Sequence, residues 1–295
     1  MADMASGTLI GVAPTGAETD KSDAPSLPVT VEELVATARA CEAAGAAVIH
    51  VHVRDADAKP TLDLGYVRAA LDAVREATDL IVQVSTGGAV TDSEADRLAV
   101  LEAGPDAASL TCGTVNFGAD VFMNPLELIE RLYLAMRERE IVPEFELFDL
   151  GHVAAMTRLL DKHGAPYGGH VHCDLVMGVP GGMPGTTQAL VSCVNALPAG
   201  ATFSATGVGR TTLPVMLAAL SAGGHLRVGM EDTLTFAPGQ PVRDNEQLVV
   251  RAAGFARHAL RAPMSTDEAR AMLGVKRRQA IPAQGVSPTQ SGAQA

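Results

Sequence analysis

The chain has 295 residues, of which 47% are hydrophobic and 19% are charged. This composition is typical of a folded protein with one large domain or two small ones, and it excludes a disordered chain. Lys and Arg number 22 against 34 Asp and Glu, so the net charge is −12. An excess of negative charge argues against a nucleic-acid or anionic-membrane partner.

Short Val-, Ile- and Leu-rich runs alternate along the chain with Ala- and Leu-rich segments of helical period. We expect strands at residues 9–14, 47–53, 80–85, 107–111, 142–148, 170–176, 201–205 and 226–229. We expect helices at residues 31–43, 64–77, 92–103, 125–140, 152–163, 186–196, 212–221 and 245–260. Several helices have start signals, namely Thr30, the run Asp92-Ser93-Glu94, and Asn124 before Pro125.

Eight strand–helix units in about 250 residues predict an α/β fold, a single-domain (β/α)8 TIM barrel over residues 1–274. A doubly wound open sheet is the alternative, but its Gly-rich phosphate fingerprint is missing after the first strand. Residues 275–295 are polar, and we expect a mobile tail or an arm that clasps a neighbouring subunit.

Whole-chain features predict a cytoplasmic protein. The four cysteines include no CxxC pair, so they indicate neither a disulfide framework nor a zinc ribbon. The first residues lack the cationic start and long apolar run of a signal peptide. No stretch approaches the ~20 apolar residues of a membrane helix.

The second expected strand ends in the pattern His50-Val51-His52. Residues i and i+2 of a strand point to the same face, so the two imidazoles can form half of a metal site. The alternative is a pair of buried histidines in a polar layer. His170 and His172, with Asp174 in the same parity, form a rival pair that sits earlier in its strand and therefore deeper in the barrel.

The eighth expected strand ends on Glu231 and Asp232, which can supply a metal ligand and a base. A guanidinium near Asp232, from Arg227, would keep that carboxylate ionised and oriented. The alternative is a surface pair of carboxylates that begins the last helix.

Polar residues beside glycines follow other strands, where barrel active sites lie. Hydroxyls that can hold a substrate carboxylate, or merely cap loops and helices, are those of Ser85, Thr111 and Thr114. A phosphate site of the kind found after the seventh strand would use Gly207, Gly209 and Arg210. Glu18, just past the first strand, is either a charge selector in the pocket or an exposed loop acid.

The motifs APTGAETDKSDAPSLPVTVEEL, IHVHVRD, QVSTGG, LTCGTVNFG, PEFELFDLGH, LVMGVPGGMPGT, GVGR and VGMEDTL occur in this order. Together they resemble the β-keto acid cleavage enzyme family (BKACE), most closely its 3-keto-5-aminohexanoate cleavage enzymes, from about residue 11 to residue 274. The combination of IHVHVRD with GMEDTL is specific to that family.

The resemblance implies a TIM barrel whose zinc ion is held by His50, His52 and Glu231, and so it selects the first HxH pair. It also implies that a β-keto acid and acetyl-CoA are converted to acetoacetate and a new acyl-CoA by a retro-Claisen route. Asp232 then matches the family's base, assisted by Arg227. An open His₂Glu zinc site suits this chemistry because it can stabilise an enolate.

The resemblance also carries substrate contacts. Ser85 matches the hydroxyl that binds the substrate carboxylate, with Thr111 and then Thr114 as further candidates. Glu18 matches the position associated with positively charged substrates, and Glu146 lies in a motif that lines the family's site. A cationic keto acid, such as 3-keto-5-aminohexanoate or dehydrocarnitine, is therefore expected.

This chain departs from the family at Phe203-Ser204, where relatives often carry Trp before the serine, and at Thr211-Thr212, where many carry His-Gln. These changes bear on the acyl-CoA contacts and the substrate. A metallohydrolase of amidohydrolase type is the alternative enzyme, and a barrel with an inert metal is the non-enzymatic one. By analogy with other large barrels we expect a homo-oligomer, a dimer or a tetramer.

Overall fold

The computed structural model describes residues 7–278, and within them eight parallel strands close into a barrel. The strand order around the barrel is β1-β12-β11-β10-β9-β6-β5-β2. In chain order these strands are β1 (Ile10–Val12), β2 (Val48–Val51), β5 (Ile81–Val84), β6 (Ala107–Thr111), β9 (Val142–Leu147), β10 (His172–Met177), β11 (Thr202–Gly207) and β12 (His225–Val228).

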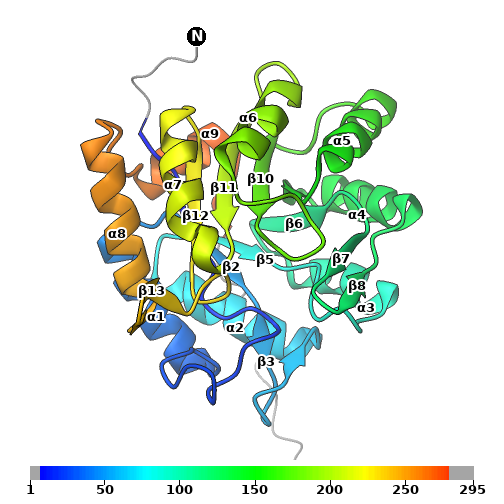
Figure 1. Cartoon of the computed structure of the whole chain (residues 1–295). Helices are drawn as coiled ribbons and strands as arrows, with labels where there is room; N and C mark the ends of the chain where they lie inside the picture. The colour runs from blue at the N-terminus through cyan, green and yellow to red at the C-terminus, as the bar shows by residue number, and fades with distance from the viewer. Residues whose placement is uncertain (1–6, 279–295) are drawn as a thin grey trace, which may run out of the picture.

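Helices surround this barrel (Figure 1). They are α1 (Val31–Ala44), α2 (Leu64–Ala77), α3 (Glu94–Ala99), α4 (Leu126–Glu138), α5 (Leu150–His163), α6 (Thr187–Ala196), α7 (Thr212–Ser221) and α8 (Asn245–His258). The predicted TIM barrel is confirmed, and most predicted element ends lie within two residues of the observed ones. The helix expected at 92–103 is instead α3 followed by a 3₁₀ turn at Val100–Ala103.

Two of the expected helix starts are confirmed and one is wrong. Thr30 caps α1 in a reciprocal capping box with Glu33, and the Ser93 hydroxyl caps α3. Helix α4 begins at Leu126 and has no side-chain cap. The reason is that the Asn124 side-chain oxygen accepts a hydrogen bond from Arg97 instead.

Three hairpins and one helix were not expected from the sequence. The hairpins are β3 (Val53–Arg54) with β4 (Pro60–Thr61), β7 (Val115–Phe117) with β8 (Asp120–Phe122), and β13 (Thr235–Ala237) with β14 (Gln240–Pro241). They follow β2, β6 and β12, so they extend the end of the barrel where those strands finish (Figure 1).

The extra helix, α9 (Thr266–Leu273), closes the opposite end of the barrel. Its residues Ala269 and Leu273 pack with residues at the starts of the strands, among them Val48, Ile81 and Val142. Covering these apolar strand starts removes them from water and leaves the other end open for a site.

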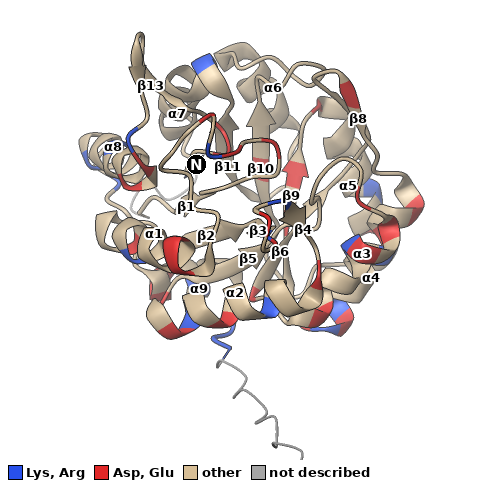
Figure 2. Cartoon of the chain, turned by 90° about the horizontal axis from the view of Figure 1, so that it is seen from below, with Lys and Arg blue, Asp and Glu red and all other residues tan. Residues whose placement is uncertain are grey.

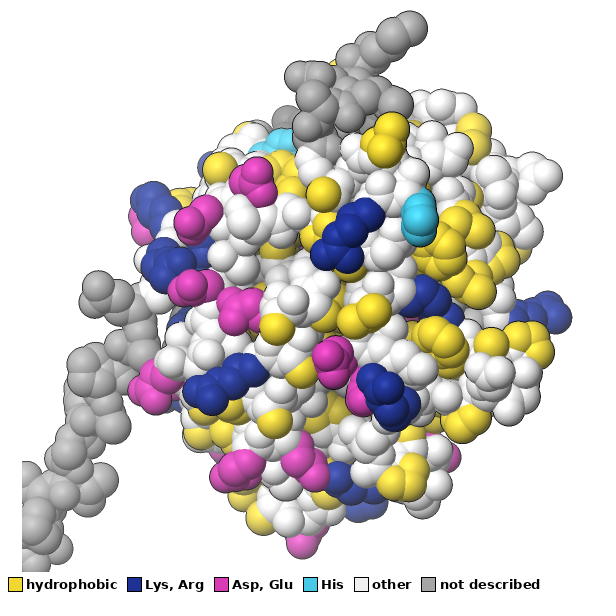
Figure 3. All heavy atoms as spheres, turned by 90° about the vertical axis from the view of Figure 1, so that its left-hand side faces the viewer, with side chains coloured by type: hydrophobic (Ala, Val, Ile, Leu, Met, Phe, Trp, Pro, Cys, Tyr) yellow, Lys and Arg dark blue, Asp and Glu magenta, His cyan; other side chains and the backbone are white. Residues whose placement is uncertain are grey.

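Figure 2 looks onto the hairpin end and shows charged residues inside the ring of helices as well as on the outer helices. On the face that carries α8, acidic, basic and hydrophobic side chains are interspersed (Figure 3). In the part of the chain that the structure describes, no helix has the length and hydrophobicity needed to cross a membrane. The tail predicted at 275–295 lies outside the described residues beyond residue 278.

Candidate metal centre and active site

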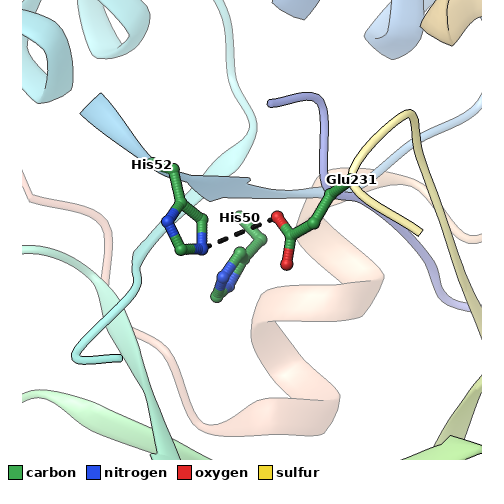
Figure 4. A group of neighbouring side chains, drawn as sticks. All are labelled: His50, His52 and Glu231. Atoms are coloured by element: carbon green, nitrogen blue, oxygen red, sulfur yellow. Dashed lines mark ion pairs between the residues drawn. The ribbon is translucent and has the colours of Figure 1, made fainter. Parts of the chain in front are cut away.

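Three potential metal ligands meet at the open end of the barrel. His50 lies in β2, His52 follows that strand, and Glu231 follows β12, the strand two places away in the barrel order. One ligand atom from each residue lies within 4.8 Å of the others, and His52 Nε2 is 3.6 Å from Glu231 Oε2 (Figure 4). The structure therefore brings together the three residues expected to hold a metal.

The loop after β1 lies directly against Glu231. The Glu231 backbone N–H donates to the Ala13 carbonyl at 3.2 Å. A Cβ atom on Gly16 would lie 2.8 Å from Glu231 Cγ, and the φ angle of Gly16 is +66°. Only glycine accepts both the left-handed backbone and this close approach, so the APTGAE loop shapes the position of Glu231.

Gln83, in the middle of β5, contacts the metal-site histidine, and the sequence analysis did not single it out. Its side-chain oxygen lies 2.5 Å from His50 Nδ1, and its Nε2 donates to Glu144 Oε2 at 3.1 Å. A carboxylate partner fixes the orientation of the amide, so the amide oxygen accepts from Nδ1–H and leaves Nε2 of His50 to bind a metal. The sequence did contain a signal for this role. Gln83 is a polar residue in an otherwise apolar strand, and it points to the same face of the strand as Ser85.

Arg227 of β12 is buried and joins several carboxylates of the site. Its guanidinium donates to Glu146 Oε1 at 3.1 Å, to Asp232 Oδ1 at 3.2 Å and to Glu231. Burial works against its charge, but Asp232, Glu231 and the other nearby carboxylates raise the pKa of Arg227 well above its usual value. The guanidinium therefore stays charged and holds Asp232 and Glu231 in place.

Asp232 and Glu231 are adjacent carboxylates with opposite pKa shifts. Burial, together with the neighbouring Glu231 charge, raises the pKa of Asp232 to about 6. Burial also pushes the pKa of Glu231 upward, but the Arg227 guanidinium and the two histidines overcome it and lower that pKa to about 2. One carboxylate is thus suited to remain an anionic ligand, and the other lies near the range of a general base.

The donor set fits a divalent metal ion. Glu231 Oε2 is buried and has no hydrogen-bond partner among the described residues, an arrangement that costs free energy unless a further group binds it. Two imidazole nitrogens and one carboxylate oxygen are ligands that zinc accepts, with further positions left open for substrate or water. The residues present therefore fit a metal ion.

A pocket of about 290 Å³ opens beside this cluster. It is lined by Glu18, Ser85 and Glu146, as expected, and by Arg227 and Asp232. Apolar side chains, which the sequence analysis did not single out, form another part of its wall: Val90, Phe117, Phe122, Phe148, Val176, Val179 and Val208.

The two threonines expected in the site, Thr111 and Thr114, do not line the pocket. Thr111 is buried beneath it and donates to Glu146 Oε2 at 2.8 Å, so its contact with substrate would be indirect. The Thr114 hydroxyl accepts from the Asn124 N–H at 2.8 Å and supports the β7–β8 hairpin.

In the loop after β11, most of the backbone N–H groups already donate hydrogen bonds within the protein. Gly207 packs tightly, since a Cβ there would lie 2.6 Å from the Thr211 carbonyl oxygen. The Gly209 N–H donates to the Asp232 carbonyl at 2.8 Å, whereas the Arg210 side chain is exposed. A phosphate contact in this loop therefore depends on Arg210 rather than on the glycines.

The second HxH pair lies in the barrel at the start of β10, away from the mouth. His172 contacts the hydroxyls of Thr202 and Ser204, and His170 contacts Thr202 as well. Asp174, in parity with them, accepts from Thr206 and lies 3.8 Å from Arg227. These groups form a hydrogen-bonded polar layer, which is the alternative interpretation of such a pair.

The fold and site define a (β/α)8-barrel protein with a His/His/Glu cluster, a buried Arg–Asp pair and a pocket at the mouth of the barrel. A model of the β-keto acid cleavage enzyme family, BKACE, matches residues 8–275. The chain belongs to this family, and it is an enzyme of β-keto acid cleavage. This membership sets aside the amidohydrolase and non-enzymatic alternatives.

Curated relatives include the 3-keto-5-aminohexanoate cleavage enzymes of Acetoanaerobium sticklandii and Fusobacterium nucleatum. They are 37% and 38% identical over 91% of this chain and 98% of each relative. The 3-oxoadipate:acetyl-CoA acetyltransferase of Cupriavidus necator is 34% identical over 90% of this chain and 94% of its own length.

Among solved structures, the apo structure of ObcA superposes with a TM-score of 0.75 at 20% identity. The match covers 85% of this chain but only 66% of the ObcA chain. At this identity the likeness supports the fold alone.

Proposed function

We propose that this protein is a zinc-dependent enzyme that converts a cationic β-keto acid and acetyl-CoA into acetoacetate and a new acyl-CoA. The observation that carries the proposal is the placement of the His50–His52–Glu231 cluster beside the Arg227–Asp232 pair in one pocket. The name of the Cupriavidus necator relative, a 3-oxoadipate:acetyl-CoA acetyltransferase, supports acetyl-CoA as the co-substrate.

The net reaction balances without a further reactant. A keto acid R–CO–CH₂–COO⁻ and acetyl-CoA exchange acyl groups, which yields R–CO–CoA and acetoacetate. The keto acid is deprotonated at the carbon between its carbonyl and carboxylate and adds to the thioester. CoA then transfers within the adduct, and a retro-Claisen cleavage releases the two products.

His50, His52 and Glu231 would hold the zinc ion, which when bound supplies Lewis-acid polarisation of a carbonyl group. The base is Asp232. Its Oδ1 is held by Arg227 at 3.2 Å, and its Oδ2 is buried with no hydrogen-bond partner in residues 7–278. One oxygen is thus fixed while the other is free to take the proton from the substrate carbon.

The charges of the pocket favour a cationic substrate. Four of its lining residues are carboxylates and one is a guanidinium, within the described residues. Three of the carboxylates, Glu146, Glu231 and Asp232, form ion pairs with Arg227. Glu18 lies in the loop after β1 and, within the described residues, forms no ion pair with that guanidinium. Glu18 is therefore the carboxylate available to pair with a substrate ammonium group.

Ser85 is the group proposed for the substrate carboxylate. It is buried at the end of β5, lines the pocket, and its hydroxyl accepts the Gly87 N–H at 3.1 Å. That bond leaves the hydroxyl proton free to donate to an anion. The exposed Arg210 is the group proposed for the phosphates of CoA.

The test is a mass-spectrometric assay of zinc-loaded protein with acetyl-CoA and cationic, neutral and anionic β-keto acids. We expect acetoacetate together with the acyl-CoA that matches each keto acid, formed fastest from a cationic one. Faster turnover of neutral or anionic keto acids would contradict the substrate class and keep the reaction. No acetyl-CoA-dependent product from any of them would contradict the reaction.

The proposal includes a cytoplasmic location and self-association as a dimer or tetramer. Four free cysteines, all buried, are consistent with a reducing compartment. Light scattering of the purified chain tests the oligomer: a monomer would contradict it.

A further inference from the structure

Arg97 is a buried arginine that lies outside the proposed catalytic groups. It projects from α3, and its exposed fraction is only 4%. Its three nitrogens donate to three different acceptors: Nε to the Thr86 carbonyl at 2.7 Å, one terminal nitrogen to the Met123 carbonyl at 2.8 Å, and the other to Asn124 Oδ1 at 2.5 Å.

These acceptors belong to two neighbouring chain segments that both contribute to the pocket wall. Thr86 stands between Ser85 and Gly87, both of which line the pocket. Met123 and Asn124 directly follow Phe122, which lines the pocket as well. One planar guanidinium with several donors in fixed directions thus ties the turn after β5 to the end of the β7–β8 hairpin.

The Phe122 ring of the hairpin lies against both the Arg97 guanidinium and the turn after β5. The Arg97 guanidinium carbon lies 4.9 Å from the ring centroid, which is the geometry of a cation–π contact. On the other segment, a Cβ on Gly87 would lie 3.0 Å from Phe122 Cζ and 3.3 Å from Ser85 Oγ. A shift of the ring would therefore change the space directly beside the Ser85 hydroxyl.

The charge of Arg97 is not neutralised by a direct ion pair. Among residues 7–278, no carboxylate lies within ion-pair distance of its guanidinium, which is instead satisfied by carbonyl oxygens and by the ring. Burial lowers the pKa of Arg97, partly offset by the charges of Glu94, Asp92 and Glu146. Burying a charge in this way costs free energy, so packing alone does not account for an arginine here.

We propose that Arg97 is a positioning residue for substrate recognition. It sets the spacing between the Ser85 hydroxyl, which binds the keto acid's carboxylate, and the Phe122 ring, against which the rest of the keto acid lies. This inference rests on the proposed function, because it takes Ser85 as the carboxylate group. It assigns substrate fit to a residue that touches neither substrate nor metal.

The test compares Arg97→Met and Arg97→Lys with the wild-type protein. Neither side chain can donate to all three acceptors at once, so we expect the KM for the keto acid to rise about tenfold in both. The zinc content should stay as in the wild type, because the proposed metal ligands His50, His52 and Glu231 do not contact Arg97. The KM for acetyl-CoA should also stay unchanged, because the group proposed for the CoA phosphates lies in a different loop, after β11. The matched control is Arg131→Met. It removes an exposed arginine of α4 that pairs with Glu94 of α3, the helix that carries Arg97.

Phe122→Leu provides a second test if the Arg97 variants fold poorly. It should raise the KM for the keto acid in the same way. Where Arg97→Lys does fold, the double variant should show little further rise in this KM, because both substitutions act through the ring position. If Arg97 served only to stabilise the fold, replacing it would instead lower the melting temperature and leave the KM of the folded fraction unchanged.

The outcomes separate the two proposals. An unchanged KM for the keto acid in Arg97→Met, or a fully additive double variant, would overturn the positioning role while the reaction stands. If the wild-type protein neither turns over nor binds any keto acid in calorimetry, the positioning role is overturned together with the proposed function.

Discussion

The imidazole of His50 donates from Nδ1 to the side-chain oxygen of Gln83, and Gln83 in turn donates to Glu144. This chain of two hydrogen bonds joins β2, β5 and β9 across the barrel interior. It orients one imidazole of the metal cluster before any metal binds, since the carboxylate of Glu144 accepts but does not donate when ionised.

Replacing Gln83 by leucine should therefore weaken metal binding without removing a ligand. We expect the affinity for zinc to fall by about 10- to 100-fold, the usual effect of removing the partner that orients a metal-binding histidine. Titration of the apo-protein against a competing chelator measures it. Gln188→Leu, at an exposed position of α6, is the matched control. Equal affinities in the two variants would show that Gln83 does not orient the ligand.

His50→Ala should abolish zinc binding, whereas His170→Ala should leave most of the zinc in place. The reason is that His50 belongs to the cluster of potential ligands, while His170 contacts the Thr202 hydroxyl at 2.7 Å. Metal content by elemental analysis of the two purified variants decides between the pairs. The reverse pattern would move the metal site to the second HxH.

Asp232→Asn should retain zinc but lose turnover by about 10²- to 10⁴-fold, the contribution typical of a general base. The amide preserves the shape of the side chain and can still accept from Arg227, so folding and metal content serve as internal controls. Near-normal turnover of the zinc-loaded variant would remove Asp232 from the mechanism.

Glu18→Gln should discriminate between substrates by charge. For a cationic keto acid we expect the KM to rise about fivefold, as befits one exposed ion pair, and for a neutral one we expect no change. Glu32→Gln, at an exposed position in the first turn of α1, is a control with the same change of charge. An equal rise for both substrates would contradict the selector role.

The polar layer at the start of β10 and β12 should make folding stability dependent on pH. Burial, with Arg261 and His170 nearby, lowers the pKa of His225 to about 4, and its Nδ1 accepts the Leu9 N–H at 3.0 Å. The unfolded chain takes up this proton near pH 6.5, so the stability contributed by neutral His225 is present above pH 6.5 and is lost as the pH falls towards 4. The full loss is about 3 kcal/mol.

Denaturant unfolding of wild type and His225→Gln between pH 7 and pH 4 measures this effect. Glutamine keeps an acceptor for the Leu9 N–H but does not titrate, so its stability should fall less over this range. The carboxylates and the other histidines contribute equally to the pH dependence of stability in both proteins. Parallel curves would mean that His225 is not the group responsible.

The amino-acid sequence by itself determined the barrel and the ligand candidates. Hydrophobic periodicity is a local property, and it separates strands from helices wherever the runs are long, as at residues 64–77, where α2 has the predicted bounds. Strand parity is also local, so the shared direction of His50 and His52 followed from their spacing alone.

Only the tertiary structure decided which polar groups meet, because contacts between distant strands depend on barrel order and register. Glu231 reaches the histidines since β1 alone separates β12 from β2, and Gln83 became a partner of His50 because β2 pairs with β5 at that level. Arg97 and Phe122 meet through a hairpin that has no periodic signal of its own. Short hairpins are stabilised by packing on the rest of the fold, and their positions therefore emerge only once the barrel has closed.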